Sequence, residues 1–582
     1  MVKSRLQKLA SYLRPHWRTV SLGILALLIV NALGVYIPIV IRDSIDRLKG
    51  EFSYSVLSRY ALTLLILSAV IWGFRMLSRV LIFGAGRQIE FTLKQRIFQH
   101  LLTIEPAYFA SNTSGDLINR ATSDVDNIRR LVGFAVLSLA NIIFAYTLTF
   151  PAMLSLNVRL TLIAVLVYPV MIVTVQLFSN KLRDRQREVQ EKLSDVSELI
   201  QEDMSGMALI RIYAQEVQER LAFRVKNQKL LGANLKLART RNLLFPIVEG
   251  ISTTSLLILL WLGTGAIATG EITVGDFVAL ILYVEKLVFP TALLGFTITA
   301  YQRGEVSIDR VEAIVQAEAK IKNLPGAISL SPTEVRGEIT ATHLTYFYPD
   351  SPQPALYDLN FTLKPGETVA IVGPIGSGKS TLANAIPRLL NIEEGQIFLD
   401  GHDITQLDLQ SLRSAIAYVP QDSFLFSTTI KNNIRYGEPL AETLEVEDAA
   451  QKAQIHPEIL NFPQEYETLV GERGITLSGG QRQRASLARA LLVNAKVLIL
   501  DDALSSVDNK TATQILNNLS SAREGKTVIF ISHQLSAAAT ADRILVMDEG
   551  KIVQNGTHQE LLQKPGLYQS LWQQHQLKEV LN

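Results

Sequence analysis

The sequence lacks cysteine altogether and is poor in charge. Among 582 residues there is no Cys, and charged side chains make up 19% against 48% hydrophobic. Without thiols the chain can form no disulfide, no zinc–thiolate site and no cysteine nucleophile. A formal net charge of +2 gives no basis for a nucleic-acid partner. The chain is too long for a single core, so we expect two or more domains.

Long apolar segments fill the N-terminal half. They cover residues 20–41, 57–83, 131–156, 160–178, 243–268 and 274–300. Each is near or above the roughly 20 residues that cross a bilayer. The first segment is too long for a signal peptide and has no small-residue cleavage site, so we expect a span there. The sequence therefore predicts an all-α transmembrane domain of six helices over residues 1–320, surrounded by membrane lipid.

Positive charge in the connections predicts the orientation. Residues 3–18 read as a basic amphipathic helix that can lie on a membrane surface. Cations are also frequent in the connections 84–130 and 179–242, whereas the turns at Asn157 and 269–273 are nearly free of them. By the positive-inside rule the N-terminus, both long connections and everything after residue 300 should be cytoplasmic. Because these connections favour helix, we expect the spans to continue well outside the lipid.

A linker separates the second domain. Residues 321–336 contain Pro325-Gly326 and Ser331-Pro332, which interrupt helix. From Gly337 onward, short β-branched runs alternate with amphipathic helical stretches, which is typical of an α/β domain. We therefore predict a multidomain membrane protein with an α/β domain at 337–582.

One stretch of this domain matches the phosphate-loop pattern without a gap. A strand-like run at 368–372 precedes it, and a helix is expected from Thr381. Glycines in such a loop let backbone N–H groups turn toward phosphates, next to a helix N-terminus. The lysine would neutralise phosphate oxygens of ATP, and the serine hydroxyl would bind Mg²⁺. The loop residues are Gly373, Pro374, Ile375, Gly376, Ser377, Gly378, Lys379 and Ser380, followed by Thr381.

Two further motifs lie downstream. The apolar run 497–500 ends in Asp501, which reads as a buried strand that presents a carboxylate to Mg²⁺ beside the phosphate loop. Between them, Leu477 precedes a helix start whose backbone could also hold phosphate, although a simple helix cap would look the same. That start comprises Ser478, Gly479, Gly480 and Gln481.

In this order the three motifs resemble an ATP-binding cassette (ABC) domain, in which residues 477–481 correspond to the signature motif, so we expect an α/β P-loop NTPase domain at 337–582. The resemblance implies that Tyr348 stacks on adenine, and that Gln421 contacts Mg²⁺ and the attacking water. It implies that His533 contacts the γ-phosphate, and that Mg²⁺ is held by Ser380, Gln421 and Asp501. Residues 505–508 resemble the family's D-loop, and 470–474 resemble the segment before the signature of exporters.

The membrane half extends the resemblance. Residues 114–122 with Asp124-Val125 resemble the first coupling helix of type I exporters (type IV transporter fold), and 206–215 occupy the second coupling position. Such a chain is a half-transporter. The resemblance implies ATP-driven export of hydrophobic or amphipathic, drug- or lipid-like compounds by alternating access. The expected location is the plasma (inner) membrane, with an organellar membrane as the alternative.

One position departs from the family pattern. After Asp501 the family has a glutamate that polarises the attacking water, whereas this chain has Asp502. The shorter side chain withdraws the carboxylate, and a displacement near 1 Å can cost about 10²-fold in rate. In the family two domains close head to tail, so the intact signature would serve the site of a second half-transporter. We therefore expect a heterodimer rather than a homodimer that tolerates aspartate.

Charged residues within the spans are candidates for substrate contact. They are Arg75, Arg79, Glu249, Glu285 and Lys286. Glu285 and Lys286 are adjacent on a helix and cannot both face one cavity. For the arginines we expect interhelical ion pairs rather than substrate contact, and for Glu285 both roles stay open.

Two other functions share this architecture. An ATP-gated channel would have the same parts, and the sequence cannot separate it from a transporter. A regulatory half that binds ATP without hydrolysing it is the second, and Asp502 favours it.

Overall fold

The computed structural model describes residues 5–48, 54–331, 333–349, 351–507, 511–512, 514–515 and 525–581. Lys3, Pro332 and Asp508, which belong to predicted segments, lie outside them. The chain divides into two compact units. The first comprises Met1–Leu102 with Thr113–Ala317, and the second comprises Thr103–Asn112 with Glu318–Asn582.

The first unit is built from long helices. Six of those that the structure describes are long and apolar enough to cross a membrane: Gln7–Arg47, Tyr54–Leu101, Ser114–Leu156, Val158–Ser205, Glu216–Ala268 and Val274–Val315. Each contains one of the six predicted apolar segments. The helical elements are α1 (Arg5–Leu13), α2 (Trp17–Leu48), α3 (Tyr54–Leu101), α5 (Ser114–Asn119), α6 (Val125–Arg130), α7 (Val136–Leu156), α8 (Val158–Val165), α9 (Val167–Ser205), α11 (Glu216–Ala268) and α12 (Val274–Val315).

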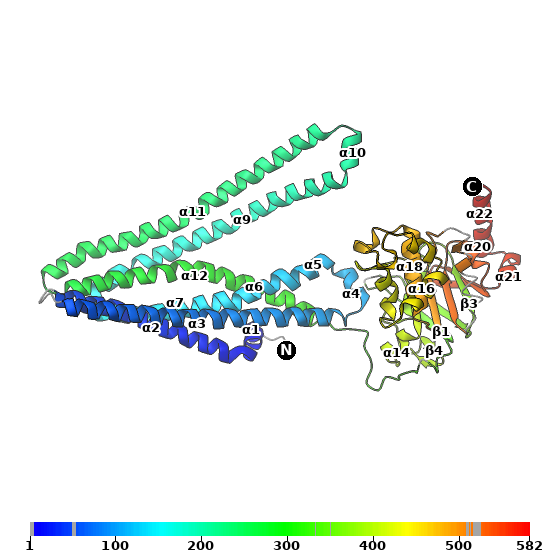
Figure 1. The fold of residues 1–582 in the computed structure, drawn as a ribbon, viewed down its shortest axis with the longest axis horizontal. Coiled ribbons are helices and arrows are strands. Elements are labelled where there is room, and N and C mark those ends of the chain that lie inside the picture. Colours follow the sequence, from blue (N-terminus) through cyan, green and yellow to red (C-terminus); the bar gives the residue numbers. More distant parts are fainter. Residues whose placement is uncertain are drawn as a thin grey trace. The chain divides into compact units, whose positions relative to one another are not determined.

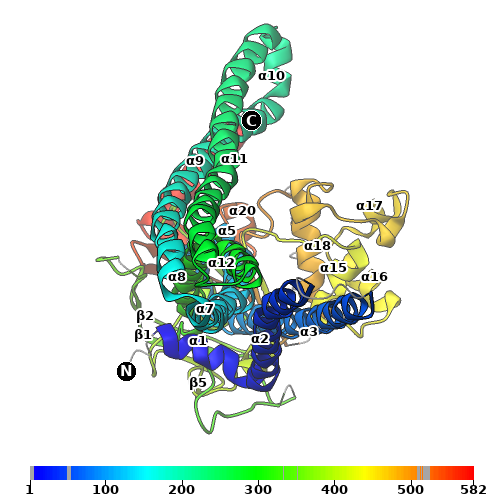
Figure 2. The ribbon, with the colours of Figure 1, turned by 90° about the vertical axis from the view of Figure 1, so that its left-hand side faces the viewer.

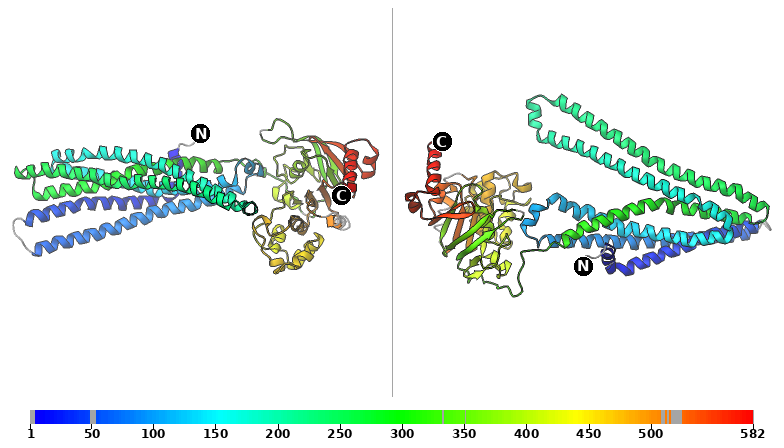
Figure 3. Two further views of the ribbon diagram at one scale, coloured as in Figure 1. Left: turned by 90° about the horizontal axis from the view of Figure 1, so that it is seen from above. Right: turned by 180° about the vertical axis from the view of Figure 1, so that it is seen from behind.

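The helices continue beyond the apolar segments, as predicted. α3 runs on to Leu101, α9 runs on to Ser205, and α11 starts at Glu216, well before its apolar part. α9 and α11 lie side by side and are joined at one end by the short α10 (Met207–Ile212) (Figures 1 and 2). Toward α10 this pair diverges from the other helices of the unit, which the right-hand view of Figure 3 also shows.

α12 is the central helix of the first unit. It packs against α2, α7, α9 and α11, and it has the longest run of buried side chains. Tyr283, Leu280 and Leu287 are wholly buried there. The basic N-terminal segment forms α1, and its Lys8 ammonium lies 3.5 Å from the Asp309 carboxylate on α12.

The second unit has an α/β core with two sheets. One is four-stranded in the order β2-β1-β4-β5, and the other is six-stranded in the order β10-β9-β3-β8-β7-β6. The strands are β1 (Ile339–Tyr346), β2 (Leu356–Leu363), β3 (Thr368–Val372), β4 (Ile397–Leu399), β5 (His402–Asp403), β6 (Ile416–Val419), β7 (Val497–Asp501), β8 (Thr527–Ile531), β9 (Arg543–Asp548) and β10 (Lys551–Gly556).

Shorter helices complete this unit. They are α4 (Pro106–Ser111), α13 (Lys379–Ala385), α14 (Leu409–Ser414), α15 (Ile430–Ile434), α16 (Thr443–Lys452), α17 (His456–Leu460), α18 (Gly479–Leu492), α20 (Leu535–Ala538), α21 (His558–Gln563) and α22 (Leu567–Leu581).

Apolar cores on both faces bury the larger sheet. Strands β3, β7 and β8 are parallel to one another and read as continuous apolar runs, because both of their faces are covered. One core joins this sheet to the four-stranded sheet through Ile371 and Ile529, and the other joins it to α16 and α18 through Leu498 and Leu487. Because apolar side chains pack on both faces of the sheet, the strand ends that carry the predicted site residues are held in place.

A hydrogen-bonded corner connects the end of α2 to the start of α12. The Asp46 carboxylate accepts from the Gly275 backbone N–H at 2.9 Å and from the Thr273 hydroxyl at 2.6 Å. Thr273 in turn caps α12 in a capping box with Asp276. Hydrogen bonds to an ionised group contribute about 1.5–3 kcal/mol each.

We expect Asp46→Ala to lower the apparent Tm of the detergent-solubilised protein by several degrees, because it leaves the first turn of α12 without these acceptors. Asp43→Ala is the matched control, one turn earlier on α2, where the carboxylate is half exposed and, among the described residues, pairs with Arg42 alone. A scanning measurement that finds equal shifts for both variants would refute the role assigned to Asp46.

Candidate active site

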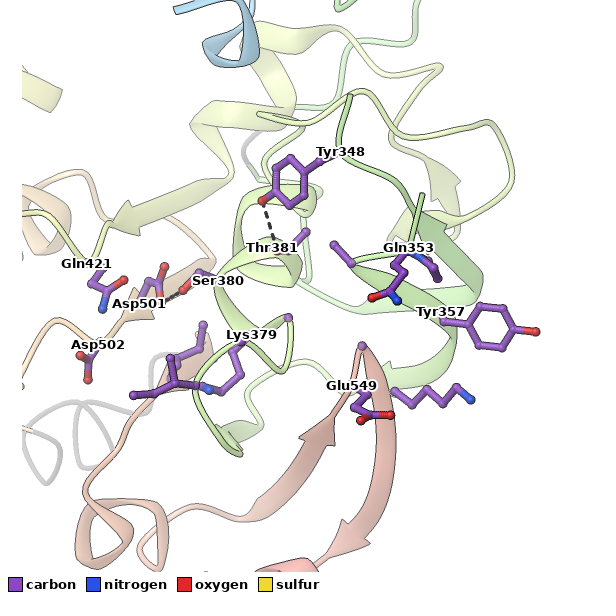
Figure 4. Close-up of a pocket in the computed structure, with 18 of the residues that line it drawn as sticks. Tyr348, Gln353, Tyr357, Lys379, Ser380, Thr381, Gln421, Asp501, Asp502 and Glu549 are labelled. Carbon is purple, nitrogen blue, oxygen red and sulfur yellow. Dashed lines mark hydrogen bonds between the residues drawn. The ribbon is translucent and has the colours of Figure 1, made fainter. Parts of the chain in front are cut away.

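Four neighbouring parallel strands bring the predicted site residues to one edge of the sheet. In the order β3, β8, β7, β6, these strands are followed by the phosphate loop, His533, Asp502 and Gln421. The carboxyl ends of parallel strands share an edge, which is where ligands bind in such sheets. There the structure has a cavity of about 890 Å³ (Figure 4). The predicted residues that line it are Tyr348, Ile375, Gly376, Gly378, Lys379, Ser380, Thr381, Gln421, Asp501, Asp502 and His533.

The phosphate loop has the backbone that its glycines permit. Gly373 has φ +152°, and a Cβ built there would lie 2.0 Å from the Met547 carbonyl oxygen, so no larger residue fits. The Lys379 ammonium lies inside the loop, 3.0 Å from the Gly373 oxygen and 2.6 Å from the Pro374 oxygen. Burial lowers the pKa of Lys379, and the nearby Asp501 and Asp502 oppose that shift. The loop thus holds a cation at the centre of a ring of backbone groups.

Two hard oxygen donors meet beside the loop. The Ser380 hydroxyl donates to Asp501 Oδ1 at 2.9 Å, and the Tyr418 hydroxyl lies 3.4 Å from Asp501 Oδ2. Burial raises the pKa of Asp501, and the hydrogen bonds from Ser380 and Tyr418 oppose the rise. A hydroxyl and a carboxylate at this spacing are the ligand types that Mg²⁺ prefers, together with phosphate oxygens. The residues present therefore fit Mg²⁺-ATP.

Asp502 has a tightly fixed backbone. Its φ is +50°, in the left-handed region where Asp and Asn are tolerated better than most residues. Its carbonyl oxygen accepts from the Ser505 hydroxyl at 2.9 Å and from Gln483 Nε2 at 3.4 Å. Gln483 is buried on α18, where its Oε1 also accepts from the Ser506 N–H at 2.8 Å. The amide of Gln483 thus joins the helix of the signature to the segment that carries Asp502.

Aromatic residues stand at the other end of the cavity. The Tyr348 hydroxyl lies 3.2 Å from the Thr381 hydroxyl, and its ring meets the Tyr346 ring edge-on with centroids 5.2 Å apart. Tyr348 is 42% exposed, so one ring face is open to a ligand. Figure 4 shows Tyr348 over the start of α13, on the side of the phosphate loop away from Asp502. This position suits a base that stacks while its phosphates reach the loop.

The signature residues lie elsewhere. Ser478 caps α18, its side chain accepting from the Gln481 N–H, and Gly480 lets the Ser506 carbonyl approach, since a Cβ there would be 2.7 Å from that oxygen. Among the residues that the structure describes around the cavity, none belongs to the signature. Gly373, Pro374 and Ser377 belong to the phosphate loop but do not line the cavity.

Residues not predicted from the sequence complete the cavity. The turn between β9 and β10 contributes Glu549 and Lys551, and β2 contributes Tyr357. The Lys551 ammonium lies 4.8 Å from the centre of the Tyr357 ring, and the Tyr357 N–H donates to the Gly550 oxygen at 2.8 Å. The signal in the sequence is weak, because Glu549-Gly550 reads only as a hairpin turn.

The expected ion pairs of the membrane arginines are not formed. Neither Arg75 nor Arg79 pairs with a carboxylate within the described part of the chain, so that expectation is wrong. Both line a cavity together with Lys286 instead. Glu285 is exposed on another face of α12, as the rotation between adjacent helix positions requires.

Comparison with known proteins gives consistent matches over both halves. The family description "ABC transporter transmembrane region" matches residues 20–291, and "ABC transporter" matches residues 356–505. The chain is 35% identical over 578 residues to the multidrug resistance-like ATP-binding protein MdlA of Escherichia coli (strain K12), covering 99% of this chain and 97% of that protein.

A second relative and a solved structure are also similar to this chain over nearly its whole length. The ATP-dependent lipid A-core flippase of Syntrophus aciditrophicus (strain SB) is 32% identical over 574 residues, covering 99% of this chain and 94% of that protein. Among solved structures, a bacterial Atm1-family ABC exporter with ATP bound superimposes with a TM-score of 0.79 at 27% identity, over 96% of this chain and 99% of that one.

We expect Tyr348→Ala to weaken ATP binding by roughly 10–100-fold, because stacking of a base on an aromatic ring contributes about 1–3 kcal/mol. Tyr348→Phe keeps the ring and loses only the contact to Thr381, so it should bind ATP nearly as the unmodified chain does. Binding of a fluorescent ATP analogue to the full chain in detergent measures both. Equal affinities of the alanine and phenylalanine variants would exclude stacking at this position.

We expect Gln483→Met to reduce kcat about tenfold or more with little change in KM for ATP, because the amide positions Asp502 and Ser506 but does not line the cavity. The measurement is made in an Asp502→Glu background, in which the site has a full-length carboxylate. Gln451→Met, on the exposed face of α16, is the control. A raised KM with an unchanged kcat would contradict the positioning role.

Proposed function

This chain belongs to the ABC transporter family, and from that premise we propose that it exports hydrophobic or amphipathic compounds as one half of a dimeric transporter. It is a multi-pass membrane protein whose ATPase domain binds ATP and couples ATP hydrolysis to transport. The observation that carries the proposal is the presence, in one chain, of six membrane-length helices and a complete phosphate site. The names of a multidrug resistance-like relative and of a lipid flippase support an apolar cargo.

The proposed roles follow from the site geometry. Lys379 neutralises the phosphates, and Tyr348 holds the adenine ring. Ser380, Asp501 and Gln421 would hold Mg²⁺, which would supply positive charge to neutralise the phosphates. Ser380 and Asp501 already lie 2.9 Å apart, which supports this assignment.

Hydrolysis needs a general base for the attacking water and a side chain that contacts the γ-phosphate. We assign the first role to Asp502 and the second to His533, both of which line the cavity. Gln421 follows β6 on the same edge and would orient the attacking water. These three side chains are the proposed catalytic residues.

A second half-transporter would complete the nucleotide site. The signature residues Ser478–Gln481 lie outside the cavity of their own chain, with Ser478 exposed at the start of α18. Backbone N–H groups at a helix start bind anions, so this surface suits the phosphates held by another chain. The exposed apolar side chains of α10 and the following turn, Leu209, Ile212 and Tyr213, also suggest a surface that a partner covers.

Asp502 favours a heterodimer. Lys379, Ser380, Gln421, Asp501 and His533 all line the cavity as the family pattern requires, and the carboxylate of the proposed base Asp502 is one methylene shorter than the family's glutamate. A partner whose site has a glutamate as the base, completed by the intact signature of this chain, would then hydrolyse ATP faster than the site that contains Asp502. A regulatory half that holds ATP for structural reasons is the second candidate, favoured by the same residue.

We further propose that the N-terminus and the ATPase domain are cytoplasmic and that the membrane is the plasma (inner) membrane. The long helical extensions α3, α9 and α11 carry the many cations of the connections, which the positive-inside rule places in the cytoplasm. The turns at the opposite ends of the helices are short.

We expect the chain purified alone in lipid vesicles to hydrolyse ATP about 10²-fold more slowly than its Asp502→Glu variant, because the aspartate is withdrawn from the water by about 1 Å. Steady-state phosphate release measures both, and Lys379→Ala in each background is the control for contaminating ATPases. Full turnover by the unmodified chain would instead establish a homodimer in which Asp502 suffices.

A further inference from the structure

The first unit contains a cavity with an unusual accumulation of positive charge. Its volume is about 910 Å³. Among the described residues that line it none is a carboxylate, and five are arginines from four helices, α6, α9, α11 and α12: Arg129, Arg130, Arg183, Arg241 and Arg303. They lie at the ends of the apolar segments, on the side proposed to be cytoplasmic.

Three of these arginines have no counter-ion among the described residues. Arg129 and Arg130 share the Asp126 carboxylate, at 2.5 and 2.7 Å, and Arg129 also lies 3.4 Å from the Glu90 carboxylate. Arg183, Arg241 and Arg303 form no ion pair within the part of the chain that the structure describes. Guanidinium groups that converge without a carboxylate repel one another, and an anion between them would remove that cost.

A buried polar atom also points to a ligand. Ser179 on α9 lines the same cavity and is 9% exposed, yet its hydroxyl has no hydrogen-bond partner among the described residues. Buried hydroxyls are nearly always hydrogen-bonded, so an unpartnered one at a cavity wall is available to a water or a ligand group inside the cavity. An oxygen of an anionic group would satisfy it.

Apolar side chains form much of the remaining wall, which also includes Asn127, Gln186 and Thr299, and this wall continues into a second cavity. Phe245 and Phe296 stand beside the arginines, while Phe134 and Leu293 line both cavities, which therefore adjoin. Phe134 lies in the π-helical turn Leu131–Ala135, a helix irregularity that is frequent at functional sites.

The second cavity repeats the charge pattern deeper in the helices. It measures about 750 Å³, and its described lining includes Arg75, Arg79 and Lys286 but no carboxylate. Trp72 and Phe289 supply apolar wall. The Ser78 hydroxyl, fully buried at this wall, likewise lacks a partner among the described residues.

We propose that these adjoining cavities bind an anionic amphipath, with its negatively charged group held by the arginines and its apolar body along the phenylalanine wall. The inference rests on the proposed export function and narrows its substrate class. Membrane topology alone requires cations at helix ends, but it does not require them to converge on a cavity or to recur in mid-span. The negative group could belong to a bilayer phospholipid or to a soluble amphipathic anion.

Charge-selective binding tests the proposal without ATP. The full chain in a neutral detergent is titrated with fluorescent 1-acyl lysophosphatidic acid and with the lysophosphatidylcholine of the same acyl chain. We expect the acid to bind at least about tenfold more tightly, and Arg183→Gln, Arg241→Gln and Arg303→Gln each to weaken it by about tenfold. Arg187→Gln is the matched control, one turn from Arg183 on α9, exposed and outside the cavity lining.

Further variants and probes keep the result interpretable. Arg183→Lys keeps the charge and should keep the preference for the acid even if the glutamine variant fails to fold. Inorganic phosphate should compete only weakly, and competition as strong as that of the lipid would overturn the amphipath assignment. Nanodiscs of phosphatidylglycerol or phosphatidylcholine separate the two sources: competition by phosphatidylglycerol supports a bilayer lipid, and unchanged binding of the probe supports a soluble anion.

ATP-driven uptake of the same probes into inverted vesicles separates this inference from the proposed function. Charge-selective binding without uptake would support the anion site and refute export. Uptake of neutral amphipaths, with equal binding of both lipids, would support export and refute the anion site. Equal binding would also result if a second chain neutralised the arginines with its own carboxylates, and it overturns the proposal in that case as well.

Discussion

Backbone hydrogen bonding in lipid is the constraint on which the first unit depends. No water reaches the hydrocarbon to bind exposed N–H and C=O groups, so each spanning segment must satisfy them internally, as a helix does. Once formed, a helix extends at little cost into water where the sequence still favours it. This is why α3, α9 and α11 run far beyond their apolar parts without a break at the lipid boundary.

The second unit is governed by a different constraint, the burial of parallel strands. Because both faces of β3, β7 and β8 are covered, the strand ends are held in register, with Asp501 opposite Ile531 and Ile371 opposite the same residue. The Ser380–Asp501 contact depends on that register, since the two residues lie 121 positions apart in the chain. The side chains at these strand ends therefore need little further positioning, except at Asp502, where Gln483 and Ser505 donate hydrogen bonds to the backbone carbonyl.

The sequence predicted the six helices and the α/β domain, and it singled out residues that the fold brings to one cavity, because their signals are local: apolar length, an ungapped loop motif, and a carboxylate after a buried run. It did not predict what depends on packing between distant segments. The ion pairs expected for Arg75 and Arg79 are absent from the described residues, since the faces these side chains take are set by neighbouring helices. For the same reason the sequence could not predict that Arg183, Arg241 and Arg303 line one cavity, because they lie on three separate helices.

The paired helices α9 and α11 have the mechanical properties of a lever. α11 has 53 residues, and its part from Glu216 to Pro246 is about 45 Å long at 1.5 Å per residue, so a tilt of about 5° at Pro246 moves its far end by about 4 Å. Pro246 interrupts the hydrogen-bond ladder of α11 directly after Phe245, a residue of the arginine-lined cavity. Bending will concentrate at that proline, which makes the cavity wall the fulcrum. Any force applied at the α10 end is thus delivered to the walls of the cavity with its displacement reduced and its magnitude increased.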